Sequence, residues 1–189
     1  MNKPKLILMA GGGAAGKTTY AEKYAAEHPG SVIISADIIR KEAYGREEDH
    51  WDENTIYDEI AAAGLSLEGL SDEEIYQTKL NIGNRLTFRL MDEKVEKTLR
   101  EGHDVIHDSV NRKKDQRARI LEKFKGLYGD AELVYLDCPL DVMLERNAKR
   151  ERHVREIGIK NMYESMEPPT IDEGFTKITI IKVKGDEEK

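Results

Sequence analysis

Apolar residues gather along the chain in short runs, which are separated by longer segments of mixed polarity. Short apolar runs bounded by turn residues are typical of strands that are buried on both faces. We expect five such strands, at residues 5–10, 31–35, 104–108, 131–137 and 177–183. The longer segments between them predict helices. These helices are expected at residues 17–28, 37–44, 53–63, 71–100, 113–129, 140–152 and 155–165.

Strands that alternate with helices predict a parallel sheet covered by helices on both faces, so the fold class is α/β. The length of 189 residues suits one domain with a proper core. We expect a single domain over residues 1–184, with a helical insertion at 45–100, and a short tail at 185–189. The longest helix of the insertion should begin at a capping box made by Ser71 and Glu74.

The first predicted strand leads into the sequence GGGAAGKT, which fits the phosphate-binding pattern G-x-x-x-x-G-K-[ST] between a strand and a helix. Glycines allow backbone N–H groups to face phosphate oxygens, and the helix N-terminus adds partial positive charge. We expect ATP to bind here, with Lys17 at the β- and γ-phosphates and the Thr18 hydroxyl as a metal ligand of Mg²⁺. The predicted nucleotide-binding residues are Gly11, Gly12, Gly13, Ala14, Ala15, Gly16, Lys17, Thr18 and Thr19.

Asp37 and Arg40 follow the second predicted strand and lie one helical turn apart. Ligands of an open parallel sheet bind outside the carboxyl ends of its strands, so this pair is expected at the same edge as the phosphate loop. A carboxylate there can accept the proton of an attacking hydroxyl, and an arginine can hold an anionic part of the acceptor. The alternative is an aspartate that caps a helix, followed by a solvated arginine.

Asp108 ends the third predicted strand and is expected at the same edge of the sheet. P-loop proteins often place an acid at this point, where it holds Mg²⁺ through water or contacts the acceptor. An equally open alternative is that Asp108 caps the following helix.

A strongly basic segment follows the fourth predicted strand and its helix. It contains Arg146, Lys149, Arg150, Arg152 and Arg155. An arginine that closes over the nucleotide from a mobile segment would stabilise the charge on the transferred phosphoryl group. We therefore expect residues 146–160 to form a lid, with Arg146 at the nucleotide and Arg150 in a catalytic role. The alternative is a solvated helix face, which is the commoner origin of such a charge run.

The formal charge of −7 is unevenly distributed along the chain. Residues 46–74 contain eleven acids and one base, and the remainder carries a charge of +3. The net charge therefore does not exclude a polyanionic substrate. A basic helix could track phosphates, although plain solvation is the commoner explanation for most of its charges. Its basic residues are Arg112, Lys113, Lys114, Arg117, Arg119, Lys123 and Lys125.

Cysteine content and hydropathy bear on the compartment in which the protein works. A single cysteine, Cys138, excludes an internal disulfide and suits a reducing cytoplasm. No stretch approaches the roughly 20 apolar residues of a membrane span, and the N-terminus is a poor signal peptide. We therefore expect a cytoplasmic protein without a membrane partner.

With these residues in place, the chain resembles the 5′-hydroxyl polynucleotide kinase module of phage-type end-healing enzymes. The resemblance runs over most of the chain and is carried by GGGAAGKTT, SADIIRK, VIHDSVN and LDCPLDVMLERNAKR. It implies a P-loop NTPase fold with an adenylate-kinase-like core, in which Lys17 and Thr18 serve ATP and Mg²⁺. It further implies that Asp37 is the general base, that Arg40 binds the phosphate next to the acceptor 5′-OH, and that Arg150 contacts the donor phosphates.

Three functions remain open on the sequence alone. The first is an ATP-dependent kinase that transfers the γ-phosphate to a hydroxyl, above all the 5′-OH of a polynucleotide. The second is a kinase of the same fold, similar to zeta-type toxins, that acts on a small molecule or a nucleotide sugar. The third is a module that binds ATP without transferring phosphate. Related P-loop kinases also place an acid after the second strand, so Asp37 does not separate the first two.

Overall fold

The computed structural model describes residues 3–45, 52–150 and 153–185. Most of the predicted tail, a short part of the predicted insertion and two residues of the predicted lid lie outside these ranges. No helix in the described ranges is both long enough and apolar enough to cross a bilayer.

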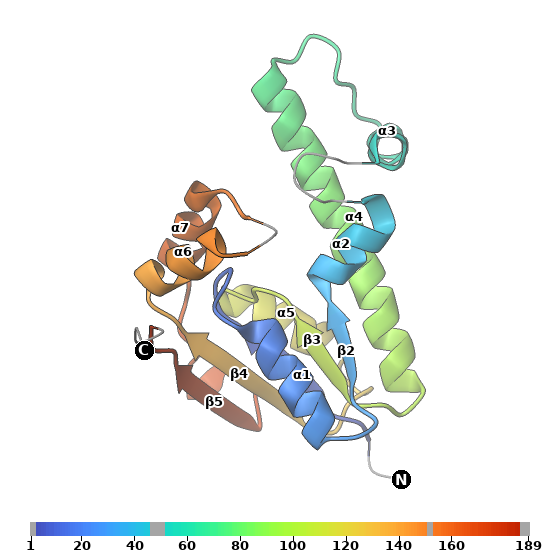
Figure 1. Cartoon of the computed structure of the whole chain (residues 1–189). Coiled ribbons are helices and arrows are strands. Elements are labelled where there is room, and N and C mark those ends of the chain that lie inside the picture. The colour runs from blue at the N-terminus through green and yellow to red at the C-terminus, as the bar shows by residue number, and fades with distance from the viewer. Residues whose placement is uncertain (1–2, 46–51, 151–152, 186–189) are drawn as a thin grey trace. The chain divides into compact units, whose positions relative to one another are not determined.

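Five parallel strands form one sheet in the order β2-β3-β1-β4-β5 (Figure 1). The strands are β1 (Leu6–Ala10), β2 (Val32–Ser35), β3 (Val105–Asp108), β4 (Ala131–Asp137) and β5 (Lys177–Lys182). Their register pairs Asp108 with Met9 on one side and with Ser35 on the other. The ends of β1, β2 and β3 therefore meet at one edge, as expected, and the α/β prediction is confirmed.

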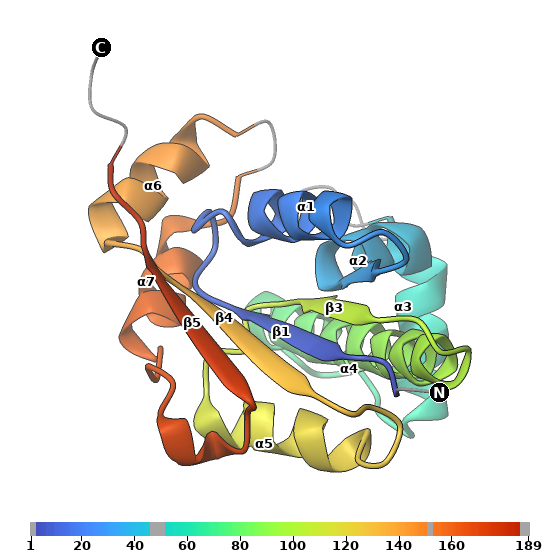
Figure 2. The ribbon, with the colours of Figure 1, turned by 90° about the horizontal axis from the view of Figure 1, so that it is seen from below.

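Helices cover both faces of this sheet. Figure 2 shows α1 (Lys17–Glu27) on one face and α5 (Lys114–Lys123) on the other. The chain continues through α6 (Leu140–Ala148), α7 (Glu156–Glu164) and the short 3-10 helix η1 (Ile171–Glu173). The central strand β1 is apolar throughout because it is buried along its whole length. Ile7, Met9 and Ile106 are fully buried and pack in one core with residues of α1, α6 and α7.

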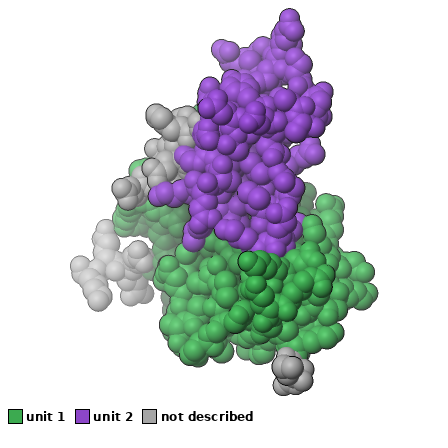
Figure 3. Space-filling model, turned by 90° about the vertical axis from the view of Figure 1, so that its right-hand side faces the viewer, with its two compact units in different colours: residues 1–35, 95–189 green, residues 36–94 purple. Residues whose placement is uncertain are grey.

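The described chain divides into two compact units, residues 1–35 with 95–189 and residues 36–94, which Figure 3 colours separately. The second unit contains α2 (Ala36–Tyr44), α3 (Glu53–Ala62) and most of α4 (Asp72–Arg100). It has an apolar core of its own, made by Tyr44, Ile56, Ile60, Ile82 and Leu86. The Tyr44 hydroxyl is within hydrogen-bonding distance, 3.1 Å, of the Thr87 hydroxyl, so the one polar atom of this buried tyrosine is satisfied.

The helix predicted over residues 113–129 is too long, because α5 ends at Lys123. The chain turns at Gly126, whose φ of 88° lies in the left-handed region that glycine adopts without strain. The helix predicted over 140–152 is also too long. Its last turn is closed by Asn147, whose side-chain amide donates to the Val154 carbonyl at 2.8 Å and accepts from the Val154 N–H at 2.9 Å.

Candidate active site

The phosphate loop joins β1 to α1 and has a backbone that an ordinary turn would not have. Gly16, directly before α1, has a φ of 98°. Ala14 has a φ of 62°, which is uncommon for a residue with a β-carbon. Alternation of right- and left-handed backbone turns successive N–H groups toward one side and creates a concavity for anions. The cost of holding Ala14 in this conformation is the kind of local strain that accumulates at functional sites.

Helices α6 and α7 lie against the phosphate loop, and the space for a side chain differs from one of its glycines to the next. A β-carbon at Gly12 would lie 2.5 Å from the Met143 sulfur of α6. A β-carbon at Gly13 would lie 3.7 Å from the Met162 sulfur of α7. A β-carbon at Gly11 would meet the backbone oxygen of Leu136 at 3.0 Å, and a backbone atom cannot move aside as a methionine can. The loop is thus held between β4, α6 and α7.

The side chains of Lys17 and Thr18 lie where nucleotide chemistry needs them. The Lys17 ammonium group donates to the Gly12 carbonyl at 2.7 Å, so it folds back over its own loop. The Thr18 hydroxyl donates to Asp108 Oδ2 at 2.9 Å. Asp108 is only 4% exposed whereas Thr18 is exposed, so a buried carboxylate meets an exposed hydroxyl at the end of β3. Thr19 is exposed in the first turn of α1.

These residues fit a triphosphate with Mg²⁺. The loop offers backbone N–H groups and one ammonium group for phosphate oxygens, and Thr18 with Asp108 offers hard oxygen atoms of the kind that Mg²⁺ prefers. The described residues contain no group of three or more His, Cys, Asp or Glu side chains that could hold a metal by themselves. Mg²⁺ commonly binds through one or two protein ligands together with the phosphates of a nucleotide, so such a protein-only cage is not required.

The loop that follows β3 supports the phosphate loop from behind. The Gly11 N–H donates to the Val110 carbonyl at 3.1 Å. The Asn111 side-chain amide donates to the Met9 carbonyl at 2.7 Å and lies 3.2 Å from His107 Nδ1. Asn111 itself has a φ of 42°, a conformation that asparagine tolerates better than most residues. Asn111 is a supporting residue that the sequence pattern did not reveal, although an asparagine between a strand and a helix is a frequent turn signal.

His107 is a neutral side chain inside the sheet. It is 1% exposed, and burial lowers its pKa from 6.5 to about 4. Since Asn111 can donate an amide hydrogen toward Nδ1, the tautomer that fits has its hydrogen on Nε2. Neutral His107 therefore links the end of β3 to the following loop through Asn111. Protonation of Nδ1 would remove this hydrogen bond.

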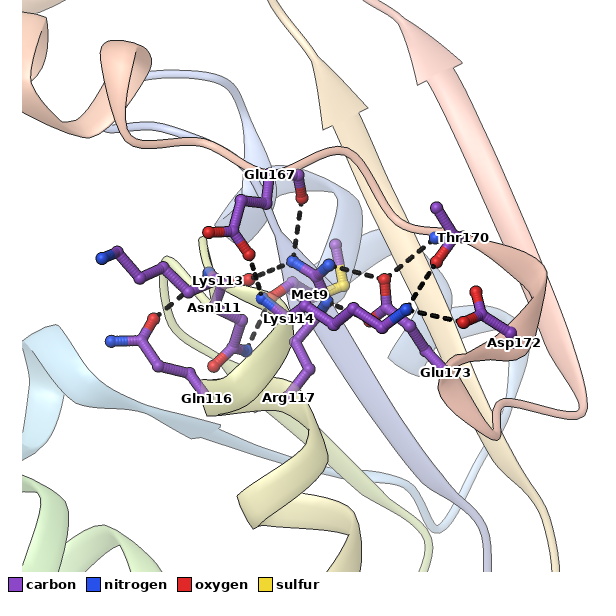
Figure 4. A network of polar contacts seen from close by, with 10 residues as sticks. All are labelled: Met9, Asn111, Lys113, Lys114, Gln116, Arg117, Glu167, Thr170, Asp172 and Glu173. Atoms are coloured by element: carbon purple, nitrogen blue, oxygen red, sulfur yellow. Dashed lines mark hydrogen bonds and ion pairs between the residues drawn. The ribbon is translucent and has the colours of Figure 1, made fainter.

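A buried ion pair fixes the same loop from its other side (Figure 4). Arg117 of α5 is fully buried and donates from Nε and Nη2 to the two carboxylate oxygens of Glu173, at 2.6 and 2.7 Å. Its Nη1 donates to the Asn111 carbonyl at 3.1 Å and to the Glu167 carbonyl at 3.0 Å. Burial raises the pKa of Glu173, but the hydrogen bonds from Arg117 and from the Thr170 N–H outweigh it and hold the pKa below its usual value. The expectation that Arg117 belongs to a solvated basic face is wrong, because its guanidinium is buried and paired with Glu173.

Of the two arginines predicted at the nucleotide, only Arg146 has a contact near the phosphate loop among the described residues. Arg146 lies beside the phosphate loop, since a β-carbon at Gly16 would be 4.0 Å from Arg146 Nη1. Its Nη2 donates to the Lys184 carbonyl at 3.3 Å. Arg150 is exposed in the turn after α6, where its backbone N–H donates to the Asn147 carbonyl at 3.2 Å. Its catalytic role stays a prediction.

Asp37 and Arg40 belong to the second unit, and they contact one another within α2. Arg40 Nη1 donates to Asp37 Oδ1 at 2.8 Å, and Nη2 donates to Asn84 Oδ1 of α4 at 3.3 Å. The Arg40 side chain is 15% exposed, so the alternative of a solvated arginine is wrong, whereas the Asp37 side chain is 66% exposed. Arg40 Nε is buried and has no hydrogen-bond partner in the described part of the chain. Asn84 is a further polar residue here that the sequence pattern did not reveal, because it is distant from Arg40 along the chain.

Comparison with known proteins places this site in a family. The family model AAA_33, an AAA domain, matches residues 6–169. A curated relative, an L-seryl-tRNA(Sec) kinase of Methanococcus maripaludis, is 24% identical over 168 residues. That match covers 87% of this chain and 53% of the relative, so the chain spans about half the length of this curated protein.

Three solved structures show the same fold at low sequence identity. A kinase of unassigned function from Chloroflexus aurantiacus is 18% identical, with a TM-score of 0.63 over 96% of this chain and 86% of that one. A fungal RNA kinase is 12% identical, with a TM-score of 0.59 over 99% and 78% of the two chains. A gluconokinase from Sinorhizobium meliloti is 18% identical, with a TM-score of 0.56 over 98% and 86%. These three proteins share a fold, and the last two are named for chemically different acceptors.

Proposed function

Because the chain belongs to the AAA_33 family, described as an AAA domain, we propose that it is a P-loop kinase that transfers the γ-phosphate of ATP to the 5′-hydroxyl end of a polynucleotide. Phosphotransfer follows from the family and from the phosphate loop. The acceptor is the proposed part. It is carried by one observation, the contact of the exposed Asp37 carboxylate with the largely buried Arg40 guanidinium.

Residues of the first unit would bind the phosphate donor. When bound, Mg²⁺–ATP supplies the phosphoryl group. The backbone N–H groups of the loop and Lys17 would hold the phosphates, and Thr18 with Asp108 would hold the metal ion. Arg146, beside Gly16, would add positive charge where the transferred group gains negative charge. Arg150 would join it if residues 146–160 act as a lid.

Residues of α2 would bind and activate the acceptor. Asp37 would accept the proton of the acceptor hydroxyl as its oxygen attacks phosphorus and the bond to the leaving ADP oxygen breaks. Asp37 is suited to this because one oxygen is held by Arg40 while most of the side chain stays accessible. Arg40 would bind the phosphate next to the 5′-hydroxyl, for which its unpartnered Nε is a free donor. A small acceptor without a phosphate would leave that donor unused.

Two acceptor classes are in competition. The similarity to a fungal RNA kinase and to an L-seryl-tRNA(Sec) kinase supports a nucleic-acid acceptor for this chain. The gluconokinase and the eleven acids within residues 46–74 favour the alternative, a small hydroxyl compound without negative charge. A module that binds ATP without transfer is the third possibility.

Acceptor-dependent release of ADP separates these functions. The panel should contain a 5′-OH oligonucleotide, the same oligonucleotide with a 5′-phosphate, and uncharged sugars and polyols. We expect turnover with the 5′-OH oligonucleotide alone, and transfer of labelled phosphate to its end. Turnover with a sugar alone would establish the alternative. Tight ATP binding without turnover on any acceptor would establish the binding module.

A further inference from the structure

Arg112 follows Asn111 in the loop after β3, and this loop is held in place from several directions. On one side, Val110 and Asn111 bond to the backbone of Gly11 and Met9, at the base of the phosphate loop. Asp108, at the start of the loop, accepts the Thr18 hydroxyl. Side chains that leave this loop are therefore anchored within a few residues of the phosphate-binding backbone.

The backbone of Arg112 is also fixed from the opposite side. The Arg112 carbonyl accepts the Glu167 N–H at 2.8 Å. The preceding carbonyl, that of Asn111, accepts from the buried Arg117 (Figure 4). A residue whose two neighbouring carbonyls are both held has little freedom in its backbone. The Cα–Cβ bond of Arg112 therefore leaves the backbone in a fixed direction.

The guanidinium of Arg112 is the unexplained group of this loop. Arg112 is partly buried, and its Nε is shielded from solvent without a hydrogen-bond partner in residues 3–45, 52–150 and 153–185. A buried donor that stays unsatisfied carries a free-energy penalty, so nearly all such groups in proteins find a partner. Arg40, which we propose binds a phosphate, is the other described residue with an unpartnered buried side-chain nitrogen.

The neighbouring acids do not neutralise Arg112, because each is already engaged. Glu173 accepts both hydrogen bonds from Arg117. Glu167 accepts the backbone N–H of Lys114 at 2.8 Å, and Asp172 accepts the Lys114 ammonium group at 2.7 Å. No carboxylate of the described residues forms an ion pair with Arg112. The loop after β3 therefore carries a positive charge that no ion pair of the described residues neutralises.

We propose that Arg112 is a phosphate-binding residue of the active site, using Nε and one Nη nitrogen as a two-pronged donor. Planar guanidinium groups bind phosphate oxygens in this way, and a lysine cannot, because it lacks the second fixed donor. The phosphate belongs either to the nucleotide or to the acceptor. The acceptor case rests on the proposed polynucleotide kinase function, and the nucleotide case does not.

Two binding constants distinguish the sources of the phosphate. The first is the Kd of a fluorescent ATP analogue with Mg²⁺, measured without acceptor. The second is the KM of a 5′-OH oligonucleotide in the ADP-release assay. Arg112→Ala should raise one of them about tenfold, since a lost charge-assisted pair of hydrogen bonds has roughly that effect. A higher Kd assigns the phosphate to the nucleotide, and a higher KM assigns it to the acceptor.

Matched variants make the result specific to Arg112. Arg119→Ala removes a charge from the nearby helix α5, where Arg119 is 78% exposed and paired with Asp115, and it should change either constant less than about twofold. Arg112→Lys should behave like Arg112→Ala, because it keeps the charge and loses Nε. The melting temperature should not fall in either Arg112 variant, since Arg112 Nε makes no hydrogen bond within the described part of the chain.

The proposal fails if both constants of Arg112→Ala stay within about twofold of wild type, or if Arg112→Lys restores the wild-type value. These outcomes leave the proposed function standing whenever wild type phosphorylates the oligonucleotide. If wild type shows no turnover on that acceptor, the proposed function fails instead. The Kd of the ATP analogue then tests the role of Arg112 by itself, and an unchanged Kd in Arg112→Ala overturns that role.

Discussion

The phosphate loop and the Asp37–Arg40 pair differ in how their functional side chains are held. In the first unit, Thr18 bonds to Asp108, which is 4% exposed, and a buried network fixes the loop behind them. In the second unit, Arg40 is 15% exposed, but the Asp37 carboxylate is 66% exposed. The donor side is thus built before any ligand arrives, whereas the proposed base stays open. This suits a kinase fold in which the nucleotide is constant and the acceptor varies between relatives.

Disruption of the buried Arg117–Glu173 pair should have the largest effect, because this pair holds the loop behind the donor side. Arg117→Ala leaves the Glu173 carboxylate buried without its cation and frees two backbone carbonyls. We expect a loss of about 3–5 kcal/mol in the free energy of unfolding, measured by urea denaturation. Lys114→Ala removes a neighbouring but exposed pair with Asp172 and should cost no more than about 1 kcal/mol. Equal losses in the two variants would contradict the view that burial makes the Arg117 pair critical.

His107 makes the donor side sensitive to acid. Its pKa is about 4 in the folded protein and 6.5 when unfolded, so the unfolded chain binds more protons between these values. The stability that neutral His107 contributes is fully present above pH 6.5 and is lost as the pH falls toward 4. The slope should approach about 1.4 kcal/mol per pH unit in this window. Urea denaturation of wild type and His107→Gln at several pH values tests this. Equal slopes in the two proteins would show that His107 does not cause the loss.

The contact between Thr18 and Asp108 predicts a smaller effect that is confined to the metal ion. Asp108→Asn keeps the shape of the side chain and removes the negative charge beside the Thr18 hydroxyl. We expect the Mg²⁺ concentration for half-maximal activity to rise about tenfold. The Kd of ATP without Mg²⁺ should not change. A change in the metal-free Kd of the same size would mean that Asp108 supports the loop and not the metal.

Asn84 gives the smallest effect and addresses only the acceptor side. Asn84→Ala removes a hydrogen bond of 3.3 Å to Arg40 and leaves the Asp37 contact in place. The acceptor KM should rise a few-fold, in keeping with the loss of one partly buried hydrogen bond, while the nucleotide Kd stays constant. A matched change at Gln77, which bonds to Glu73 elsewhere on α4, should leave both constants unchanged. An altered nucleotide Kd in Asn84→Ala would contradict the claim that Asn84 affects only the acceptor side.

The features that local patterns encode were predictable from the sequence. All five strands lie within one residue of their expected bounds, because a buried parallel strand is a short apolar run. The phosphate loop was recognised from its glycines and from Lys17 and Thr18, and Asp108 from its position at a strand end. The features that depend on distant partners were not predictable. Arg117 looked like part of a solvated basic face because Glu173, its partner, lies 56 residues away. Likewise, nothing local indicates that Arg40 would be shielded beside Asn84.

The identity of the base is the central claim, and the turnover of Asp37→Ala tests it most directly. Asp58→Ala, which removes an exposed acid from α3, serves as the control. If Asp37 accepts the proton of the acceptor, its loss should lower kcat for phosphorylation of a 5′-OH oligonucleotide about 10²–10⁴-fold. The Kd of Mg²⁺–ATP should remain that of wild type. A kcat near that of wild type in Asp37→Ala would contradict the account, whatever acceptor the enzyme uses.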